Sequence, residues 1–331
     1  MTTRSFGTRA GLRITVEIPD EWAHRIRKPL DRIRRRQERH GPRATSGPAT
    51  TAQEGQLLFG DHRMLRTVER EPSAGLAFIE GRISTLEAAT ENCSEPQTLQ
   101  EQVDALPWYH TIDLPGGVVT PGAFDHRDLV ARYGIPASLA KRAVLDVAAA
   151  DGFWSFEFER RGGRVTALDI ATTDDIDLPG PVRALADERA LSTSLRNGFD
   201  LARSARRSRV TPLTKSVYDL DPGVDGLFDL VHAGDVLLHL RDPLRALEQI
   251  RAVCTGELLL SDVFDPSLVG DGLTRYTGGW HTAGWWLPSL DTLAQMVLDA
   301  GFASVELVTT YMLAIQGSTW GPWRAVIRAR A

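Results

Sequence analysis

Short apolar runs alternate with amphipathic stretches over the C-terminal two thirds of the chain. Residues 143–147 and 165–168 are apolar runs of strand length, and residues 153–161 between them show helical spacing. Small residues fill the turn at 148–152. A strand, a tight turn, a helix and a second strand within about thirty residues predict a βαβ unit, whose two strands are parallel.

The same alternation continues toward the C-terminus. We expect further strands at 210–218, 228–232, 257–263, 305–310 and 325–330, and helices at 181–206, at 289–300 and from a cap at Asp242 to about Val253. With the first two strands this makes seven. The predicted fold is α/β, a doubly wound Rossmann-like sheet, in which ligands bind at the carboxyl ends of the strands.

Residues 1–106 have a different pattern. Asp20 can cap an arginine-rich helix that Pro29 kinks, and residues 41–52 have the composition of a linker. Helices are expected from there to the last one at 99–106. We therefore predict an N-terminal helical extension over 1–106, acting as a lid or accessory region, and one α/β domain over 107–331.

Composition describes an ordinary globular enzyme. The 331 residues exceed one compact core, 42% are hydrophobic and 24% are charged. The net charge of -5 argues against a nucleic-acid-binding surface over the whole protein, although the arginine-rich helix could bind phosphate locally or be a solvated face. We see no transmembrane run and no signal segment, and the cysteines and histidines match no metal-site spacing, so we expect a cytoplasmic protein without a metal.

The turn after the first strand indicates which cofactor binds. Asp169 ends the second strand about twenty residues later, where a ribose-binding carboxylate lies in βαβ nucleotide units. A pyrophosphate needs several glycines, but this turn contains only Gly152 and is flanked by Asp146 and Asp151. Carboxylates repel a diphosphate and attract the ammonium and sulfonium charges of S-adenosylmethionine. S-adenosylmethionine is therefore favoured over NAD.

Four segments together resemble the class I S-adenosylmethionine methyltransferases. They are WYHTIDLPGGVVTPGAFDHR at 108–127, VLDVAAADGFW at 144–154, FDLVHAGDVLLHLRDPLRAL at 228–247 and WWLPSLDTLAQMVLDAGF at 285–302. The likeness is greatest to the branch that includes the tRNA wobble-uridine methyltransferases and their actinobacterial natural-product relatives. It covers roughly residues 100–330 and implies a mostly parallel sheet whose last strand is antiparallel.

Three positions depart from that branch. Ala148 stands where the first family motif opens with glycine, and Ala150 is a further added methyl group. Leu238 stands where the wobble-uridine enzymes that use a carboxylated cofactor have tyrosine. The resemblance therefore implies S-adenosylmethionine itself as the cofactor.

The resemblance and the predicted strand ends together define an expected cofactor site. Asp169 is expected at the ribose hydroxyls, Tyr218 and Asp219 at the adenine, and residues 233–235 near the methionine portion and the acceptor. The expected cofactor contacts are Tyr109, Asp146, Ala148, Asp151, Gly152, Asp169, Ile170, Tyr218, Asp219, Ala233 and Gly234.

Methyl transfer to an amine or hydroxyl needs a nearby group that takes or holds a proton. His239, after the fourth strand, is our first candidate for this role and Asp235 the second, although His239 could equally serve in packing. Aromatic and polar residues around them are expected to form the acceptor pocket, or alternatively an apolar seam between lid and core. The expected acceptor contacts are His110, Asp113, Phe124, His126, His281, Trp285 and Trp286.

The acidic residues near the expected cleft indicate a small cationic acceptor. They are Asp113, Asp125, Asp235 and Asp265. N- or O-methylation of an amino sugar, such as an aminoglycoside, or of another intermediate of antibiotic biosynthesis is the resulting hypothesis. The alternatives are a tRNA wobble-uridine methyltransferase and a catalytically inert scaffold with a cofactor-type fold.

Overall fold

The computed structural model describes residues 2–7, 13–18, 98–185, 194–269, 272–278, 284–317 and 321–331. The chain divides into two units, Met1–Glu71 and Pro72–Ala331. In the first unit, β1 (Thr2–Gly7) and β2 (Arg13–Ile18) form an antiparallel pair that the sequence pattern does not predict. The expected arginine-rich helix, the linker and the helices before residue 98 lie outside the described residues.

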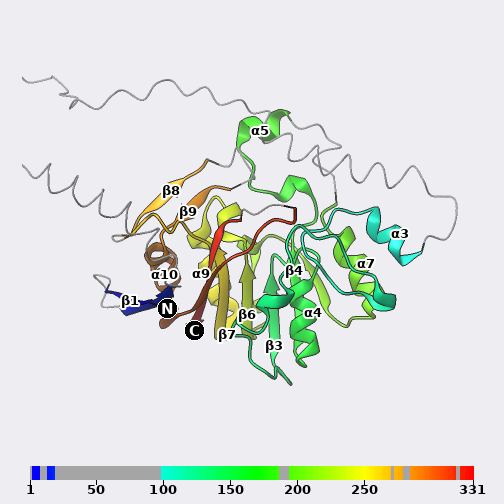
Figure 1. Ribbon diagram of the computed structural model, residues 1–331, viewed down its shortest axis with the longest axis horizontal. Coiled ribbons are helices and arrows are strands. Elements are labelled where there is room, and N and C mark those ends of the chain that lie inside the picture. Colours follow the sequence, from blue (N-terminus) through cyan, green and yellow to red (C-terminus); the bar gives the residue numbers. More distant parts are fainter. Residues whose placement is uncertain are drawn as a thin grey trace, which may run out of the picture. The chain divides into compact units, whose positions relative to one another are not determined.

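Seven strands of the second unit form one sheet in the order β10-β11-β7-β6-β3-β4-β5 (Figure 1). Neighbouring strands from β5 to β7 pair in parallel, and β11 is antiparallel to both of its neighbours. The predicted doubly wound fold with an antiparallel last strand is confirmed. The strands are β3 (Ala143–Val147), β4 (Arg164–Asp169), β5 (Thr211–Thr214), β6 (Phe228–Gly234), β7 (Cys254–Val263), β10 (Ser304–Met312) and β11 (Trp323–Arg330).

Helices cover the two faces of the sheet. Crossovers between parallel strands are right-handed, so α4 (Phe153–Arg160), between β3 and β4, and α9 (Pro243–Val253), between β6 and β7, lie on opposite faces. The other helices and short strands are α3 (Leu99–Asp104), α5 (Gly180–Leu185), α7 (Asn197–Arg206), α8 (Pro222–Asp225), α10 (Leu290–Asp299), β8 (Thr274–Tyr276) and β9 (Trp286–Pro288). No helix in the described part of the chain is long and apolar enough to cross a membrane.

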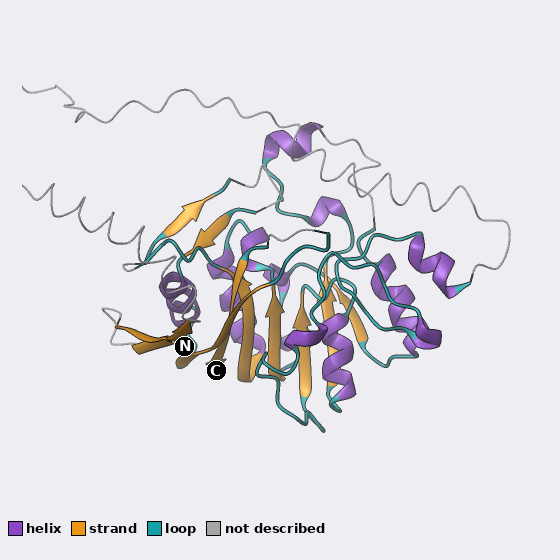
Figure 2. Ribbon diagram, in the orientation of Figure 1, coloured by secondary structure: helices purple, strands orange, loops and turns teal. Residues whose placement is uncertain are grey.

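Local side-chain caps explain where several helices begin. Asp242 accepts a hydrogen bond from the Arg245 amide at the start of α9, and Ser289 accepts one from the Thr292 amide at the start of α10. Both helix starts agree with the sequence pattern. Figure 2 shows the arrowheads of the parallel strands pointing toward the side where β8, β9 and α5 lie.

The single long helix expected over 181–206 is wrong. Ser194 forms a β-bridge with Thr172, and the amide of Leu195 donates to the carbonyl of Ala171. Residues 194 and 195 therefore pair with the segment that follows β4 instead of continuing a helix. Helix α7 begins at Asn197.

The strand expected over 210–218 is shorter in the structure. It ends at Thr214, because the Ser216 hydroxyl accepts a hydrogen bond from the Tyr218 amide and begins a 3-10 turn at Val217–Asp219. A side-chain oxygen that bonds to nearby backbone competes with the strand ladder. The chain consequently bends across the carboxyl edge of the sheet, and Tyr218 lies there.

Helix α3 is packed into the second unit. Val103 is fully buried in the hydrophobic core, and the Trp108 indole nitrogen donates to the Val103 carbonyl at 2.8 Å. The division between the units at Glu71 therefore lies N-terminal to the domain boundary that we expected at residue 106.

Candidate active site

A cavity of about 260 Å³ opens at the carboxyl ends of the parallel strands, where the fold predicts a ligand. Its walls come from the turns after β3, β4, β5 and β6 and from the segment before β3. It brings together many of the predicted site residues. These are Tyr109, His110, His126, Ala148, Asp151, Asp169, Ile170, Tyr218, Gly234, Asp235 and His239.

Other predicted site residues do not line this cavity. His281 lies outside the described residues. The remaining ones support the cavity walls or lie on the surface, and they are Asp146, Gly152, Asp219, Ala233, Asp113, Phe124, Trp285 and Trp286.

The turn between β3 and α4 has a left-handed backbone at three positions. Ala148 has φ of 58°, Ala150 has φ of 48°, and Gly152 has φ of 91°. A Cβ atom on Gly152 would come within 2.9 Å of the rings of Phe156 and Phe199. Gly152 is therefore required by the turn and by helix packing, whereas the two alanines hold a conformation that suits glycine.

Ala148→Gly and Ala150→Gly should each stabilise the protein by about 0.5–1 kcal/mol. Removing a left-handed strain of about 1–2 kcal/mol outweighs the extra flexibility of glycine in the unfolded chain, which costs about 0.5–1 kcal/mol. Urea unfolding measures the change. Ala149→Gly is the matched control, because Ala149 is buried and not left-handed, and it should destabilise the protein. If Ala148→Gly and Ala150→Gly both destabilised the protein, the two alanines would not be strained.

Asp169 is placed as a ribose-binding carboxylate should be. Its two oxygens accept hydrogen bonds from the amides of Ala150, at 2.7 Å, and Ile170, at 2.8 Å. Burial raises the pKa of Asp169 from its ordinary value, and these two amides oppose the shift. Each oxygen keeps lone-pair capacity for a further donor. The vicinal hydroxyls of a nucleoside ribose match this carboxylate.

Apolar and aromatic side chains line the cavity together with Asp169. Ile176, Leu195 and Val217 supply apolar surface, and Tyr218 supplies a ring. The Tyr218 hydroxyl donates to Asp177 at 2.8 Å and accepts from the Asp242 amide at 3.0 Å, which fixes the ring. A carboxylate next to an apolar, aromatic-walled slot fits the adenosine moiety of S-adenosylmethionine.

The two carboxylates that flank the turn also bond to other parts of the protein. Asp151 accepts hydrogen bonds from the amides of Tyr109, at 2.5 Å, and His110, at 2.9 Å. Asp146 is buried behind the cavity, where it bonds to His232 and Ser155. Asp151 therefore lines the cavity while it braces the segment before β3, whereas Asp146 does not line the cavity.

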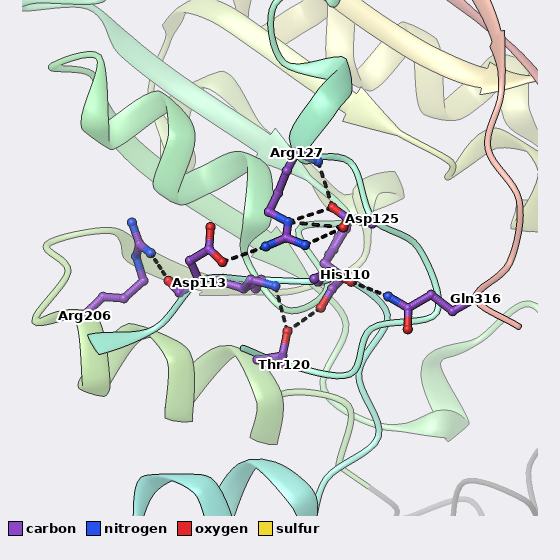
Figure 3. Close-up of polar contacts among 9 residues, drawn as sticks. His110, Asp113, Thr120, Asp125, Arg127, Arg206 and Gln316 are labelled. Atoms are coloured by element: carbon purple, nitrogen blue, oxygen red, sulfur yellow. Dashed lines mark hydrogen bonds and ion pairs between the residues drawn. The ribbon is translucent and has the colours of Figure 1, made fainter. Parts of the chain in front are cut away.

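The segment before β3 is braced from several sides (Figure 3). Arg127 bonds to both Asp113 and Asp125, the Arg206 guanidinium donates to the Asp113 carbonyl, and the Gln316 amide donates to the Thr111 hydroxyl at 2.9 Å. Asp113, expected at the acceptor, is consequently an exposed ion-pair partner. The bracing holds the neighbouring Tyr109 and His110 in the cavity wall.

Both tryptophans expected at the acceptor bond to backbone carbonyls next to the residues that fix Tyr218. The Trp285 indole donates to the Asp177 carbonyl at 2.7 Å, and the Trp286 indole donates to the Arg241 carbonyl at 3.1 Å. Their bonds position the backbone of the residues that hold Tyr218. Neither tryptophan lines the cavity.

Asp235 is held by a partner far away in sequence. Its backbone is left-handed with φ of 49°, and its carboxylate lies 2.8 Å from Nε of Arg324 on β11 and 2.8 Å from the Tyr109 hydroxyl. Arg324 is only 2% exposed and lies over the ring of Phe124. Asp235, our second candidate for the proton acceptor, is therefore one half of a buried ion pair.

Two imidazoles with an unsatisfied nitrogen face each other in the cavity wall. The ring centroids of His110 and His126 are 5.2 Å apart, and Nδ1 of each is buried without a hydrogen-bond partner. Burial lowers the pKa of His126 to about 3 and that of His110 well below its ordinary value. Both rings are neutral near pH 7. Each can accept or donate a hydrogen bond to a polar, uncharged ligand.

Several residues that line the cavity were not predicted as site residues. They are Tyr133, Trp154, His232, Ser261 and Tyr311. Trp154 and His232 lie within the family-like segments at 144–154 and 228–247, whereas no local pattern marks the other three. Arg324, which bonds to Asp235 in the cavity wall, is a charged residue next to an apolar strand, a sign of a buried ion pair.

Asp262, at the end of β7, supports the loop after β6. Its carboxylate accepts hydrogen bonds from the amides of Val236, Leu237 and Val263. Burial, and secondarily the charge of Asp235, raise the pKa of Asp262 to about 7.

Stability should fall as pH rises from about 4 to about 7 because of this group. The folded state keeps the Asp262 proton over that window while the unfolded state has already released it, so the stabilisation present at low pH is lost. Urea unfolding at about pH 5 and about pH 8 measures the drop. The side chain in Asp262→Asn cannot titrate, so this variant should lose less stability between the two pH values, even if it is less stable at both. Equal losses in the wild type and the variant would show that Asp262 is not the group responsible.

Comparison with known proteins gives the family. A family model described as a methyltransferase domain matches residues 125–307, which is more than half of the chain. No curated protein matches the sequence.

The chain is also similar to solved structures. The N-terminal domain of EvdMO1, in the presence of SAH and D-fucose, is 17% identical with a TM-score of 0.48, over 76% of this chain and 97% of that one. The 1,6-didemethyltoxoflavin-N1-methyltransferase of Burkholderia thailandensis is 16% identical with a TM-score of 0.41, over 80% and 92%. Magnesium protoporphyrin IX methyltransferase of Synechocystis PCC 6803 is 14% identical with a TM-score of 0.43, over 77% and 97%.

The family match covers β3 to β7 and the start of β10, and hence the parallel part of the sheet with the turn and the Asp169 carboxylate that fit the nucleoside of the donor. The chain therefore belongs to the methyltransferase-domain family and is an S-adenosylmethionine-dependent methyltransferase.

Proposed function

We propose that this protein methylates a hydroxyl group of a small, uncharged acceptor held in the cavity. Bound S-adenosylmethionine supplies an activated methyl group, so the protein contributes mainly alignment and control of the acceptor proton. Asp169 would hold the ribose and the Tyr218 side the adenine. The acceptor would lie toward Tyr109, His110, His126 and Asp235.

The pairing of the acidic residues carries this proposal. Each carboxylate that the sequence reasoning assigned to a cationic acceptor has an arginine within 2.8 Å: Asp113 and Asp125 have Arg127, Asp235 has Arg324, and Asp265 has Arg275. The acceptor side thus has no spare negative charge from this set to hold an ammonium group. We therefore favour a neutral hydroxyl compound over an amino sugar as the acceptor.

Polar but neutral side chains support the same choice. His110, His126 and Tyr133 line the cavity and are all buried, and their pKa values are shifted by burial so that all three are uncharged near pH 7. Buried neutral donors and acceptors bind hydroxyl groups without the desolvation cost of an unpaired charge. A cavity of about 260 Å³ favours a small molecule over a tRNA as the acceptor.

Labelled methyl transfer tests the proposal. Purified full-length protein is incubated with methyl-labelled S-adenosylmethionine and four sets of acceptors: phenols, neutral methyl glycosides, the matching amino glycosides with aminoglycosides, and unmodified tRNA. We expect at least about tenfold faster labelling of a neutral hydroxyl compound than of its amino counterpart, which corresponds to about 1.4 kcal/mol. Labelled amino sugar or tRNA with inert neutral compounds would overturn the proposal.

Calorimetry with S-adenosylhomocysteine addresses the inert-scaffold alternative. A working enzyme should bind it with a dissociation constant in the micromolar range, which corresponds to about -8 kcal/mol. Absence of both binding heat and a thermal shift would favour the scaffold.

A further inference from the structure

A buried chain of polar side chains leads from the cavity into the core. The Tyr133 hydroxyl lies 3.0 Å from Nε2 of His232, and Nδ1 of His232 lies 2.7 Å from the Asp146 carboxylate. The other oxygen of Asp146 accepts from the Ser155 hydroxyl at 2.5 Å. Tyr133 and His232 are each 1% exposed and both line the cavity, whereas Asp146 does not.

The sheet itself builds the inner part of this chain. Asp146 and His232 are register partners on the neighbouring parallel strands β3 and β6, so their side chains project from the same face of the sheet. The outer part is held by packing. The Tyr133 ring stacks on Trp154 with centroids 3.9 Å apart.

The direction of the hydrogen bonds follows from what each group can donate. A carboxylate only accepts, so Nδ1 of His232 carries the proton that is shared with Asp146. In the neutral ring Nε2 is then an acceptor, and the Tyr133 hydroxyl donates to it. The phenolic oxygen keeps a lone pair for a ligand, and burial raises the pKa of Tyr133, which keeps the phenol protonated at rest.

Resting on the proposed function, we propose that Tyr133 is the catalytic residue that takes the acceptor's hydroxyl proton and that His232 and Asp146 receive it by relay. As the acceptor oxygen forms its bond to the methyl carbon, the carbon–sulfur bond breaks and its electron pair stays on sulfur. The acceptor proton moves to the Tyr133 oxygen, and the Tyr133 proton moves to Nε2 of His232. The resulting imidazolium is stabilised by the Asp146 carboxylate.

The relay explains a buried arrangement that stability alone does not require. A chain of buried polar groups contributes little more to stability than apolar residues of similar shape, and it is costly whenever one member loses its partner. The relay also replaces our earlier candidates. Asp235 is paired with Arg324, and His239 lines the cavity without belonging to this chain.

The tautomer of His232 provides a test that needs no acceptor. Imidazole nitrogen shifts are measured by NMR in the full-length protein with S-adenosylhomocysteine added, for the wild type and for Tyr133→Phe. We expect Nδ1 to carry the proton, Nε2 to be unprotonated, and only the Nε2 shift to change markedly in the variant. A proton on Nε2 in the wild type would overturn the relay.

Kinetics provide the second test. Phenol and thiophenol serve as probes, because thiophenol is ionised near neutral pH and needs no base. Tyr133→Phe keeps the ring that stacks on Trp154, so affinity for S-adenosylhomocysteine should stay within about twofold. It should lower kcat for phenol by about 100-fold or more and kcat for thiophenol by less than about threefold. Tyr276→Phe, an exposed tyrosine outside the cavity, is the matched control and should leave both rates unchanged.

The outcomes separate this inference from the proposed function. Equal rates of phenol methylation by Tyr133→Phe and the wild type would refute the relay while leaving the hydroxyl-methylating function intact. An equal loss with both probes would show a structural role for Tyr133 and would also refute it. If the wild type methylates neither probe, the proposed function fails for phenols and the His232 tautomer still decides whether the relay exists.

Discussion

Replacing Arg324 with methionine should lower the free energy of unfolding by about 3–5 kcal/mol, the largest stability loss that we expect for a single substitution outside the hydrophobic core. Arg324 is almost fully buried, and its Nε lies 2.8 Å from both carboxylate oxygens of Asp235. Methionine fills much of the same volume but leaves Asp235 without its countercharge. A buried ion pair need not stabilise a protein, but removing one partner leaves an uncompensated charge, which is strongly destabilising.

A double-mutant cycle separates the charge from the packing. Asp235→Asn combined with Arg324→Met leaves no unpaired charge at this place, so the double variant should be clearly more stable than the sum of the two single changes predicts. Arg330→Met is the matched control, because Arg330 is an exposed residue on the same strand, and it should change stability by less than about 0.5 kcal/mol. Urea unfolding at constant pH supplies all the values. An Arg324→Met loss below about 1 kcal/mol would mean that water reaches Asp235 and that the pair is not a buried one.

Features that depend on local pattern could be predicted from the sequence. Strand β3, helix α4 and strand β4 follow from apolar runs and spacing, and the starts of α9 and α10 follow from a capping Asp242 and Ser289. The position of Asp169 at the end of its strand is equally local. Errors arose where one side chain redirects the chain, as Ser216 does after β5.

Features that depend on contacts between distant segments could not be predicted. Tyr133 and His232 are 99 positions apart, and Asp235 and Arg324 are 89 positions apart. Single-sequence patterns carry no information on such pairs, so the relay and the ion pair were invisible. The same limit applies to the pairing of charges. Acidic residues counted along the chain suggested a cationic acceptor, but the arginines that pair with them become apparent only in three dimensions.

The direction of a side chain is also lost in a linear pattern. Asp146 and Asp151 both lie near the turn, and a sequence places them equally close to a ligand. In the structure Asp146 projects from the face of β3 and bonds to His232 on β6, whereas Asp151 bonds to the amides of residues 109 and 110. Of the acidic residues near the turn, Asp169 lines the cavity and accepts only from the amides of Ala150 and Ile170, so we expect it to contribute most to cofactor binding.

Asp169→Ala should weaken binding of S-adenosylhomocysteine by about 100-fold. Two ribose hydroxyls each donate to the carboxylate, and hydrogen bonds to a charged group contribute about 1.5–3 kcal/mol each. Part of that loss of binding free energy is offset in the variant, because water can solvate the amides of Ala150 and Ile170, which donate to Asp169 in the wild type. Asp169→Asn retains one acceptor oxygen and should lose less. Calorimetric titration measures the three dissociation constants.

Control measurements decide whether such a loss is specific to the ribose. Asp128→Ala, at an exposed acidic residue outside the cavity, should leave affinity unchanged. Analogues of S-adenosylhomocysteine that lack one ribose hydroxyl should bind the wild type more weakly than the parent compound does. They should bind Asp169→Ala as well as the parent compound does, because the carboxylate that the missing hydroxyl would contact is absent. A thermal melt confirms that the variant is folded. Unchanged affinity in a folded Asp169→Ala would mean that the ribose binds elsewhere. The methyl group would then not be oriented toward Tyr133 as proposed.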